Sequence, residues 1–163
     1  MPPQAMFVTL FYGVLDRVNH TLTYANAGRP APLVFRTHDC LCSELISSGV
    51  ALGAMEGMEY EAHELRFCAG DIVVFYTGGV TEALNSQSEL YGLERLSNVV
   101  SASCHLTSSE ILDRILEDIS NFSGNQEQYD DITLIVVKAE NTTRGISSPK
   151  ESQTDISQAA ESA

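Results

Sequence analysis

The sequence predicts an α+β protein with its strands in the first half and its helices in the second. The first half holds short runs of β-branched and aromatic residues that alternate with polar ones or stay apolar, as strands do. Residues 93–119 instead repeat apolar side chains at helical spacing. A last apolar run, Ile132 to Val137, predicts a strand after the helices.

The strands of the first half are predicted in chain order. Phe7–Leu15 is the first, and Thr21–Ala25 alternates polar and apolar residues as a half-buried strand should, so that residues 16–20 form a hairpin turn. After the break at residues 28–30, Pro32–Phe35 is the third strand. Tyr60–Phe67 alternates again, with Tyr60, Ala62, Leu65 and Phe67 expected to point inward. Asp71–Tyr76 is a continuous apolar run between glycines, which predicts a central strand buried on both faces.

The second half contains two amphipathic helices. One face of the first carries Leu93, Leu96, Val99 and Val100. The second begins at Thr107, because Thr107 and Glu110 have capping-box spacing, and its apolar stripe runs from Ile111 to Ile119. Residues 121–128 are predicted to be a polar loop.

The folded domain is expected to span residues 1–138, and residues 139–163 to be a disordered polar tail. From Ala139 onward the chain is dominated by Ser, Thr, Asn, Gln and Glu without periodicity. Such a segment cannot bury enough apolar area to offset the entropy lost on ordering.

Composition and charge exclude several classes of protein. The net charge of −13 argues against a nucleic-acid partner, because phosphate contacts need clustered Lys and Arg. With 44% hydrophobic residues the chain is not wholly disordered, and no apolar run approaches the roughly 18 residues of a membrane span. Most of the acidic excess lies between residues 41 and 138, which indicates either solvated surfaces or an acidic site that attracts divalent cations.

A cytoplasmic location is expected. Residues 5–15 lack the basic start and the cleavage site of a signal peptide and are interpreted as a strand. The four cysteines are interpreted as reduced thiols, although Cys40, Cys42 and Cys104, with nearby histidines, leave a metal site as an alternative.

Two loops could carry chemistry. Asp130 and Asp131 directly precede the last strand, where carboxylates could bind Mg²⁺ or Mn²⁺, although such a pair is also common in solvated turns. The stretch from Thr77 to Glu82 follows the central strand, and its paired glycines allow close backbone approach or simply form a turn into a helix.

At these loops the sequence resembles the SpoIIE/RsbU-type branch of the PPM metal-dependent protein serine/threonine phosphatases. The stretches that match in the family's order are FVTLFYGVLD (7–16), LTYANAGRPAPLVFR (22–36), GVALG (49–53), AGDIVVFYTGGVTEA (69–83), YGLERL (91–96) and DDITLIVVK (130–138). The resemblance implies a sandwich of antiparallel sheets flanked by helices. It also implies two Mn²⁺ or Mg²⁺ ions, held by aspartates, that activate a water for attack on phosphoserine or phosphothreonine. The implied substrates are phosphorylated anti-anti-sigma-factor proteins of bacterial partner-switching pathways.

Carried over residue by residue, the resemblance assigns a metal-ligand role to Asp130, and to no residue a catalytic one. Asp131 is expected to shape the loop. The family usually has aspartate at the position of Gly78, so a ligand is lost there, and Glu82 has no evident reason to replace it. Arg29 stands where many members have histidine.

The family's upstream motifs, a G-D-x-x-D-like stretch and D-x-S-G-H-G, do not occur in this chain. Residues 1–138 are therefore expected to be the C-terminal portion of the domain, inactive alone, with exposed sheet edges that pair with another polypeptide or in a homo-oligomer. The alternatives are a non-catalytic pseudophosphatase that binds an anti-anti-sigma-type partner, or an α+β interaction module that shares only the fold.

Overall fold

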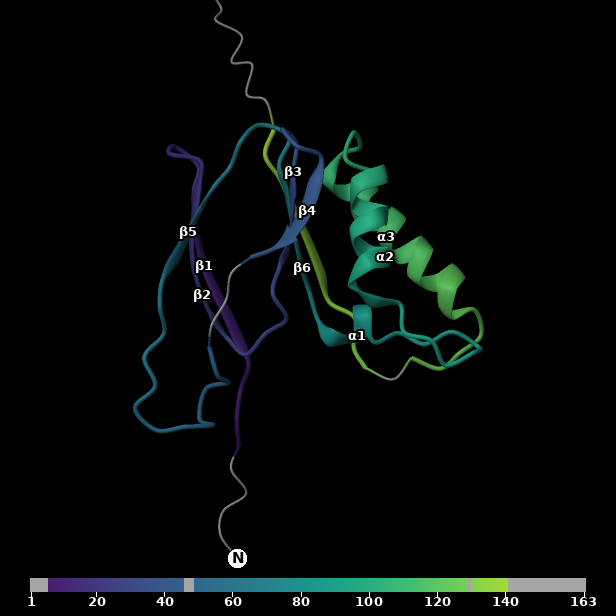
Figure 1. The fold of residues 1–163 in the computed structure, drawn as a ribbon, viewed down its shortest axis with the longest axis horizontal. Coiled ribbons are helices and arrows are strands. Elements are labelled where there is room, and N and C mark those ends of the chain that lie inside the picture. The colour runs from purple at the N-terminus through teal and green to yellow at the C-terminus, as the bar shows by residue number, and fades with distance from the viewer. Residues whose placement is uncertain (1–5, 46–48, 129, 141–163) are drawn as a thin grey trace, which may run out of the picture.

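A computed structural model describes residues 6–45, 49–128 and 130–140. The chain forms two antiparallel sheets that pack face to face, and the helices cover the outer face of the second sheet (Figure 1). This arrangement confirms the predicted α+β sandwich. The predicted polar tail, apart from residues 139 and 140, lies outside the described residues.

The first sheet has the order β1-β2-β5. Its strands are β1 (Leu10–Asp16), β2 (Thr21–Ala27) and β5 (His63–Arg66). A tight hairpin joins β1 to β2, since Asp16 pairs with Thr21 and its carboxylate accepts hydrogen bonds from the N–H groups of Val18 and Asn19 at 2.8 and 3.0 Å. The predicted hairpin turn is confirmed.

The second sheet has the order β4-β3-β6-β7. Its strands are β3 (Leu33–Arg36), β4 (Leu41–Glu44), β6 (Ile72–Tyr76) and β7 (Leu134–Lys138). In β6, Ile72, Val73 and Val74 are fully buried, because helices cover one face and the first sheet covers the other. The prediction of a central strand buried on both faces is confirmed.

Three helices follow β6 in the described chain: α1 (Gly78–Thr81), α2 (Gly92–Ala102) and α3 (Ser108–Ser123). The predicted capping box is present, because the Thr107 hydroxyl accepts from the N–H of Glu110 and the Glu110 carboxylate accepts from the N–H of Thr107. Helix α3 continues through residues 121–123, which the sequence assigned to a loop. Phe122 packs against the core there, edge-on to the ring of Tyr91. This contact stabilises helical structure in a stretch whose polar sequence predicted a loop.

Several strand boundaries differ from the prediction. Among residues 6–9 only Val8 pairs, with Leu52, so the first strand begins later than Phe7. Strand β5 covers only the second part of Tyr60–Phe67, and Ala62, expected to point inward, is exposed. Strand β4 was not predicted, because its sequence is polar and it lies at the edge of its sheet.

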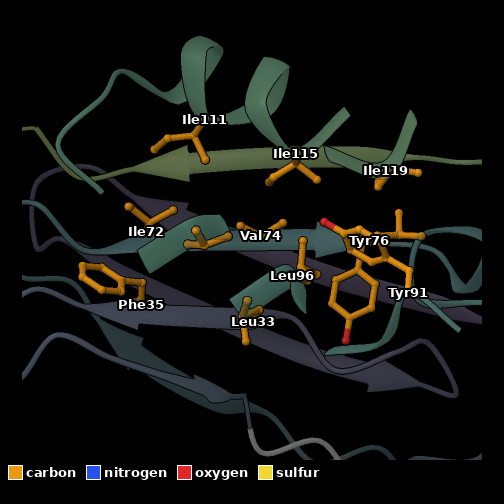
Figure 2. Close-up of a cluster of buried hydrophobic side chains, with 12 residues drawn as sticks. Leu33, Phe35, Ile72, Val74, Tyr76, Tyr91, Leu96, Ile111, Ile115 and Ile119 are labelled. Carbon is orange, nitrogen blue, oxygen red and sulfur yellow. The ribbon is translucent and has the colours of Figure 1, made fainter. Parts of the chain in front are cut away.

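Two apolar clusters hold the layers together. Figure 2 shows the larger one, in which Tyr91 and Leu96 lie among side chains of β3 and β6, and Ile111, Ile115 and Ile119 of α3 pack along the same cluster. The smaller cluster lies between the two sheets, where Leu22, Tyr24 and Leu65 face Val34 and Val73. The helices therefore fix the position of β6 and β7, whose ends carry the candidate site.

No helix in the described part of the chain is long and apolar enough to cross a membrane.

Candidate functional site

The two loops selected from the sequence meet at one end of the second sheet. Strands β6 and β7 are antiparallel neighbours, with Tyr76 opposite Leu134, so the residues after β6 lie beside those before β7. The Thr77 hydroxyl joins the loops, because it donates to the carbonyl of Asp131 at 2.8 Å and accepts from the N–H of Thr133 at 2.9 Å. A third bond runs from the N–H of Thr77 to the carbonyl of Thr133 at 3.1 Å.

Gly79 is required by the close approach of these loops. A Cβ at this buried position would lie 2.7 Å from the carbonyl oxygen of Asp131 and 2.9 Å from that of Asp130. Both contacts are closer than real Cβ atoms come, and both partners are backbone atoms. Of the two explanations for the paired glycines, close backbone approach therefore holds at Gly79.

Gly78 has different surroundings. A Cβ here would lie 2.9 Å from Oε1 of Glu82, whose side chain folds back over the start of α1. The N–H of Glu82 also donates to the carbonyl of Gly78 at 2.8 Å, which sets the two residues one helical turn apart. The Glu82 carboxylate thus lies beside the position where an aspartate side chain would begin. Sequence reasoning gave Glu82 no role, although the four-residue spacing across a helical turn is a signal that could have placed it there.

Asp130 is exposed at the mouth of the loop. Its Oδ1 accepts from the N–H of Asp131 at 2.8 Å, and its carbonyl accepts from Nε2 of Gln128 at 2.7 Å. Asp131 contributes to the loop through its backbone, whose carbonyl binds Thr77.

Asp130 and Glu82 line the same cavity, with a volume of about 540 Å³, between α1 and the C-terminal half of α3. Carboxylate oxygens are the donors that Mg²⁺ and Mn²⁺ prefer. However, no group of three His, Cys, Asp or Glu side chains placed to hold a metal ion occurs within residues 6–45, 49–128 and 130–140. These residues therefore do not fit the two-metal centre that the family resemblance implies.

Arg29 lies near the same end of the sheet. Asn26, which is buried, holds the turn before it, because its side chain accepts from the N–H of Arg29 and donates to the Arg29 carbonyl, both at 2.9 Å. Arg29 itself is exposed and lines an apolar groove together with Thr77 and Thr133. The structure thus brings Arg29 close to the loop pair, which nothing in the sequence spacing indicated.

A polar network secures α3 beside the cavity. The Asp118 carboxylate accepts from Nε and Nη2 of Arg95 at 2.7 and 3.0 Å and from the Tyr91 hydroxyl at 2.8 Å. The hydrogen bond from Arg95 is the main cause that holds the pKa of Asp118 below its usual value. Burial, followed by the hydrogen bond to Asp118, raises the pKa of Tyr91. The guanidinium of Arg95 also packs over the rings of Tyr91 and Phe122, so the network links α2 to α3.

Comparisons with known proteins identify the family. The family described as Stage II sporulation protein E (SpoIIE) matches residues 2–140. Protein IcfG of Synechocystis is 35% identical over 133 residues, which is 82% of this chain and 21% of that protein. The phosphoserine phosphatase RsbU of Bacillus subtilis is 28% identical over 136 residues, which is 82% of this chain and 39% of that protein.

Solved structures show the same fold. The SiaA-PP2C domain of Pseudomonas aeruginosa superposes with a TM-score of 0.70 at 18% identity, over 81% of this chain and 52% of that one. The phosphatase domain of SpoIIE from Bacillus subtilis gives 0.62 at 17% identity, over 83% of this chain and 58% of that one. This chain therefore spans between 21% and 58% of the length of these relatives. The solved structures show that the chain shares the fold of these phosphatase domains, and the family match over residues 2–140 shows that it belongs to the SpoIIE family.

Proposed function

We propose that this chain is part of a protein serine/threonine phosphatase domain of bacterial partner-switching signalling, and that it does not hydrolyse phosphoproteins by itself. The family membership supports the phosphatase ancestry, and the RsbU relative supports the signalling role. One observation carries the proposal of inactivity. Backbone contacts hold the two loops together, but Gly78 has no side-chain oxygen at the position where the family usually has an aspartate.

In this proposal Asp130 is a metal ligand of the assembled domain. The Asp131 and Thr77 contacts hold its backbone, and the side chain is exposed toward the cavity that it shares with Glu82. The remaining ligands for Mn²⁺ or Mg²⁺ come from outside the described residues. The substrate is a phosphorylated anti-anti-sigma-factor-like protein. The domain acts in the cytoplasm, where the four free cysteines stay reduced.

The test is Mn²⁺-dependent hydrolysis of a phosphoserine peptide, with Mn²⁺ affinity measured in parallel by calorimetry. The unmodified chain is expected to hydrolyse no peptide above background. Gly78→Asp adds the carboxylate that the family usually has at this position, and Gly78→Ala is the matched control that adds only the Cβ. Because an aspartate there meets the carboxylate of Glu82, we would combine Gly78→Asp with Glu82→Gln to remove the repulsion between them.

Gly78→Asp with Glu82→Gln is expected to bind Mn²⁺ at least about tenfold more tightly than Gly78→Ala with Glu82→Gln. Asp130→Asn in the same background should abolish this gain. Robust Mn²⁺-dependent turnover by the unmodified chain would overturn the proposal of inactivity. Equal Mn²⁺ affinity of the aspartate and alanine variants would show that position 78 does not face the ion.

A second candidate function is that of a pseudophosphatase that binds a phosphorylated anti-anti-sigma-type protein without hydrolysing it. The absence of a carboxylate at Gly78 favours this reading too, since it removes a ligand without disturbing the fold. Two measurements distinguish the two functions. A pseudophosphatase binds the phosphoprotein without Mn²⁺, and Gly78→Asp brings it no gain in Mn²⁺ affinity.

A further inference from the structure

Arg29 extends from a rigid turn at one end of the first sheet. The turn follows β2, and the side chain of the buried Asn26 accepts from the N–H of Arg29 and donates to its carbonyl, each at 2.9 Å. Gly28 has a φ of 79°, and a Cβ there would lie 2.9 Å from the backbone nitrogen of Ala51. Pro30 restricts the backbone on the other side of Arg29. The backbone of Arg29 is therefore fixed by the fold, and a ligand has only the side chain to order.

The side chain of Arg29 lies at the end of the sandwich where the two loops of the candidate site meet. Arg29 lines the same groove as Thr77 and Thr133, which join the loop after β6 to the loop before β7. Figure 1 shows the connection from β2 to β3 at the same end of the sandwich as α1. Arg29 thus reaches the site from the first sheet, whereas Asp130 and Glu82 reach it from loops of the second.

The other basic residues of the described chain form contacts of their own or lie at the far end of the first sheet. Arg36, Arg95 and Arg114 pair with Asp71, Asp118 and Glu117, and Lys138 donates to the carbonyls of Cys104 and Leu106. Arg17 lies in the turn between β1 and β2, and Arg66 lies opposite Thr21 at the start of β2. Within the described chain, Arg29 is therefore the one basic residue beside the loop pair that forms no ion pair with a carboxylate.

A phosphate group that binds at this end of the sandwich needs a positive partner. Asp130, Asp131 and Glu82 are acidic, and a phosphorylated serine itself carries a charge of about −1.5 to −2 at neutral pH. A guanidinium is suited to this task, because it presents parallel N–H donors that bind two phosphoryl oxygens at once. Histidine, which many members of the family have at position 29, cannot form this paired contact, since its two ring nitrogens point apart.

We propose that Arg29 binds the phosphoryl group of the phosphoserine or phosphothreonine substrate. This inference rests on the proposed function, because it takes the loop pair as the place where the phosphoprotein binds. Hydrolysis and binding without hydrolysis both need a contact to the phosphoryl group, so the inference applies to the phosphatase and to the pseudophosphatase. Two N–H groups of the guanidinium donate to phosphoryl oxygens, and the rigid turn fixes the direction from which the phosphorylated side chain approaches Asp130.

The proposal is tested by fluorescence anisotropy with a labelled phosphoserine peptide and its unphosphorylated counterpart, in buffer without Mn²⁺. The unmodified chain is expected to bind the phosphopeptide at least about tenfold more tightly than the serine peptide, and inorganic phosphate should compete with it. Arg29→Gln should weaken phosphopeptide binding at least about tenfold, because it removes the charge-assisted hydrogen bonds. Arg29→Lys keeps the charge but not the paired donors, so it should recover only part of the affinity.

Arg17→Gln is the matched control, because it removes the same charge from another exposed residue of the first sheet. The seven residues of β2 separate the two ends of this sheet by roughly 20 Å, which exceeds the Debye length of about 8 Å at physiological ionic strength. Arg17→Gln should therefore leave the affinity for the phosphopeptide within about twofold of that of the unmodified chain.

Two further measurements separate phosphate binding from a structural role of the guanidinium. In nuclear magnetic resonance spectra, the phosphopeptide should shift the Nε–H signal of Arg29, and the serine peptide should leave it unchanged. Arg29→Gln should unfold at the same urea concentration as the unmodified chain, because the bonds from Asn26 that hold the turn go to the backbone of residue 29.

Equal affinity of the unmodified chain for the two peptides would overturn the proposal. An equal loss of affinity in Arg29→Gln and Arg17→Gln would overturn it too, since only the overall charge would then matter. A lower urea midpoint for Arg29→Gln would show that the guanidinium stabilises the fold instead. Phosphopeptide binding that Arg29→Gln leaves unchanged would overturn the role of Arg29 and leave the proposed function standing, because Mn²⁺ affinity and turnover test that function separately.

Discussion

The adjacent glycines at the start of α1 give the sharpest test of the site geometry. Gly79→Ala adds a Cβ that would lie 2.7 and 2.9 Å from two backbone carbonyl oxygens of the Asp130 loop. Gly78→Ala adds the same atom, but it would meet only the flexible carboxylate of Glu82, at 2.9 Å. The two substitutions thus have the same chemistry and differ in whether the obstructing atom can move.

The expected magnitudes follow from this difference. Overpacking a close-packed site costs about 1 to 3 kcal/mol, and Gly79 is buried against the loop that must shift. Alanine's higher helix propensity offsets less than about 1 kcal/mol of this in a helix of four residues. We therefore expect Gly79→Ala to lower the free energy of unfolding by about 2 kcal/mol, which is a fall of about 4 to 8 °C in Tm. Gly78→Ala should stay within about 0.5 kcal/mol of the unmodified chain, because Glu82 can swing away.

Urea denaturation followed by far-UV circular dichroism is the suitable assay, because the chain has no tryptophan to report on unfolding. An unchanged m-value would show that the substitutions act on the folded state. If Gly79→Ala unfolds at the same urea concentration as the unmodified chain, the loop carbonyls are not held where the structure has them. If Gly78→Ala is the more damaging of the two, the reasoning about rigid and flexible neighbours is wrong.

Three further outcomes are expected. Thr107→Ala removes the cap of α3 and should lower the free energy of unfolding by about 1 kcal/mol in the same urea assay, whereas an unchanged midpoint would mean that the capping box adds no stability. Ile115→Ala empties a fully buried position in the larger cluster and should cost about 2 to 5 kcal/mol, and a loss below about 1 kcal/mol would show that the site collapses around the gap. Burial opposes ionisation of Asp71, but hydrogen bonds from the N–H groups of Thr37 and Cys68 and from Arg36 outweigh it and hold the pKa of Asp71 below its usual value. A lowered pKa in the folded state means that the ionised Asp71 carboxylate stabilises the fold at neutral pH. The free energy of unfolding should therefore fall as the pH drops below the unfolded-state pKa near 4 and through the lower folded-state pKa. Asp71→Asn should be less stable at pH 7 and should lose part of this acid dependence.

Much of the fold could be predicted because it depends on local patterns. The capping box of α3 and the apolar run of β6 are signals within a few residues, and each formed as expected. The hairpin between β1 and β2 likewise follows from a short polar turn between two strand patterns. Strand β4 escaped prediction, because a polar edge strand gains its structure from its neighbour β3 rather than from its own sequence.

The candidate site also combines local signals with contacts between distant residues. Sequence reasoning selected both loops, and family resemblance gave Asp130 a metal-ligand role, which stays a prediction. The contacts that explain the glycines could not be predicted from the sequence. Gly79 must be glycine because of backbone carbonyls more than fifty positions away in the chain. The position of the Glu82 carboxylate depends on the helical turn of α1, which brings the Glu82 side chain beside Gly78.

The sequence alone determined which family this chain belongs to, which stretches become strands and helices, and that Gly78 lacks the family's carboxylate. Those properties depend on residue types and short spacings. Only the tertiary structure decided that Glu82 and Asp130 share a cavity. This depends on the pairing of strands distant in the chain, since strand order determines which loops meet.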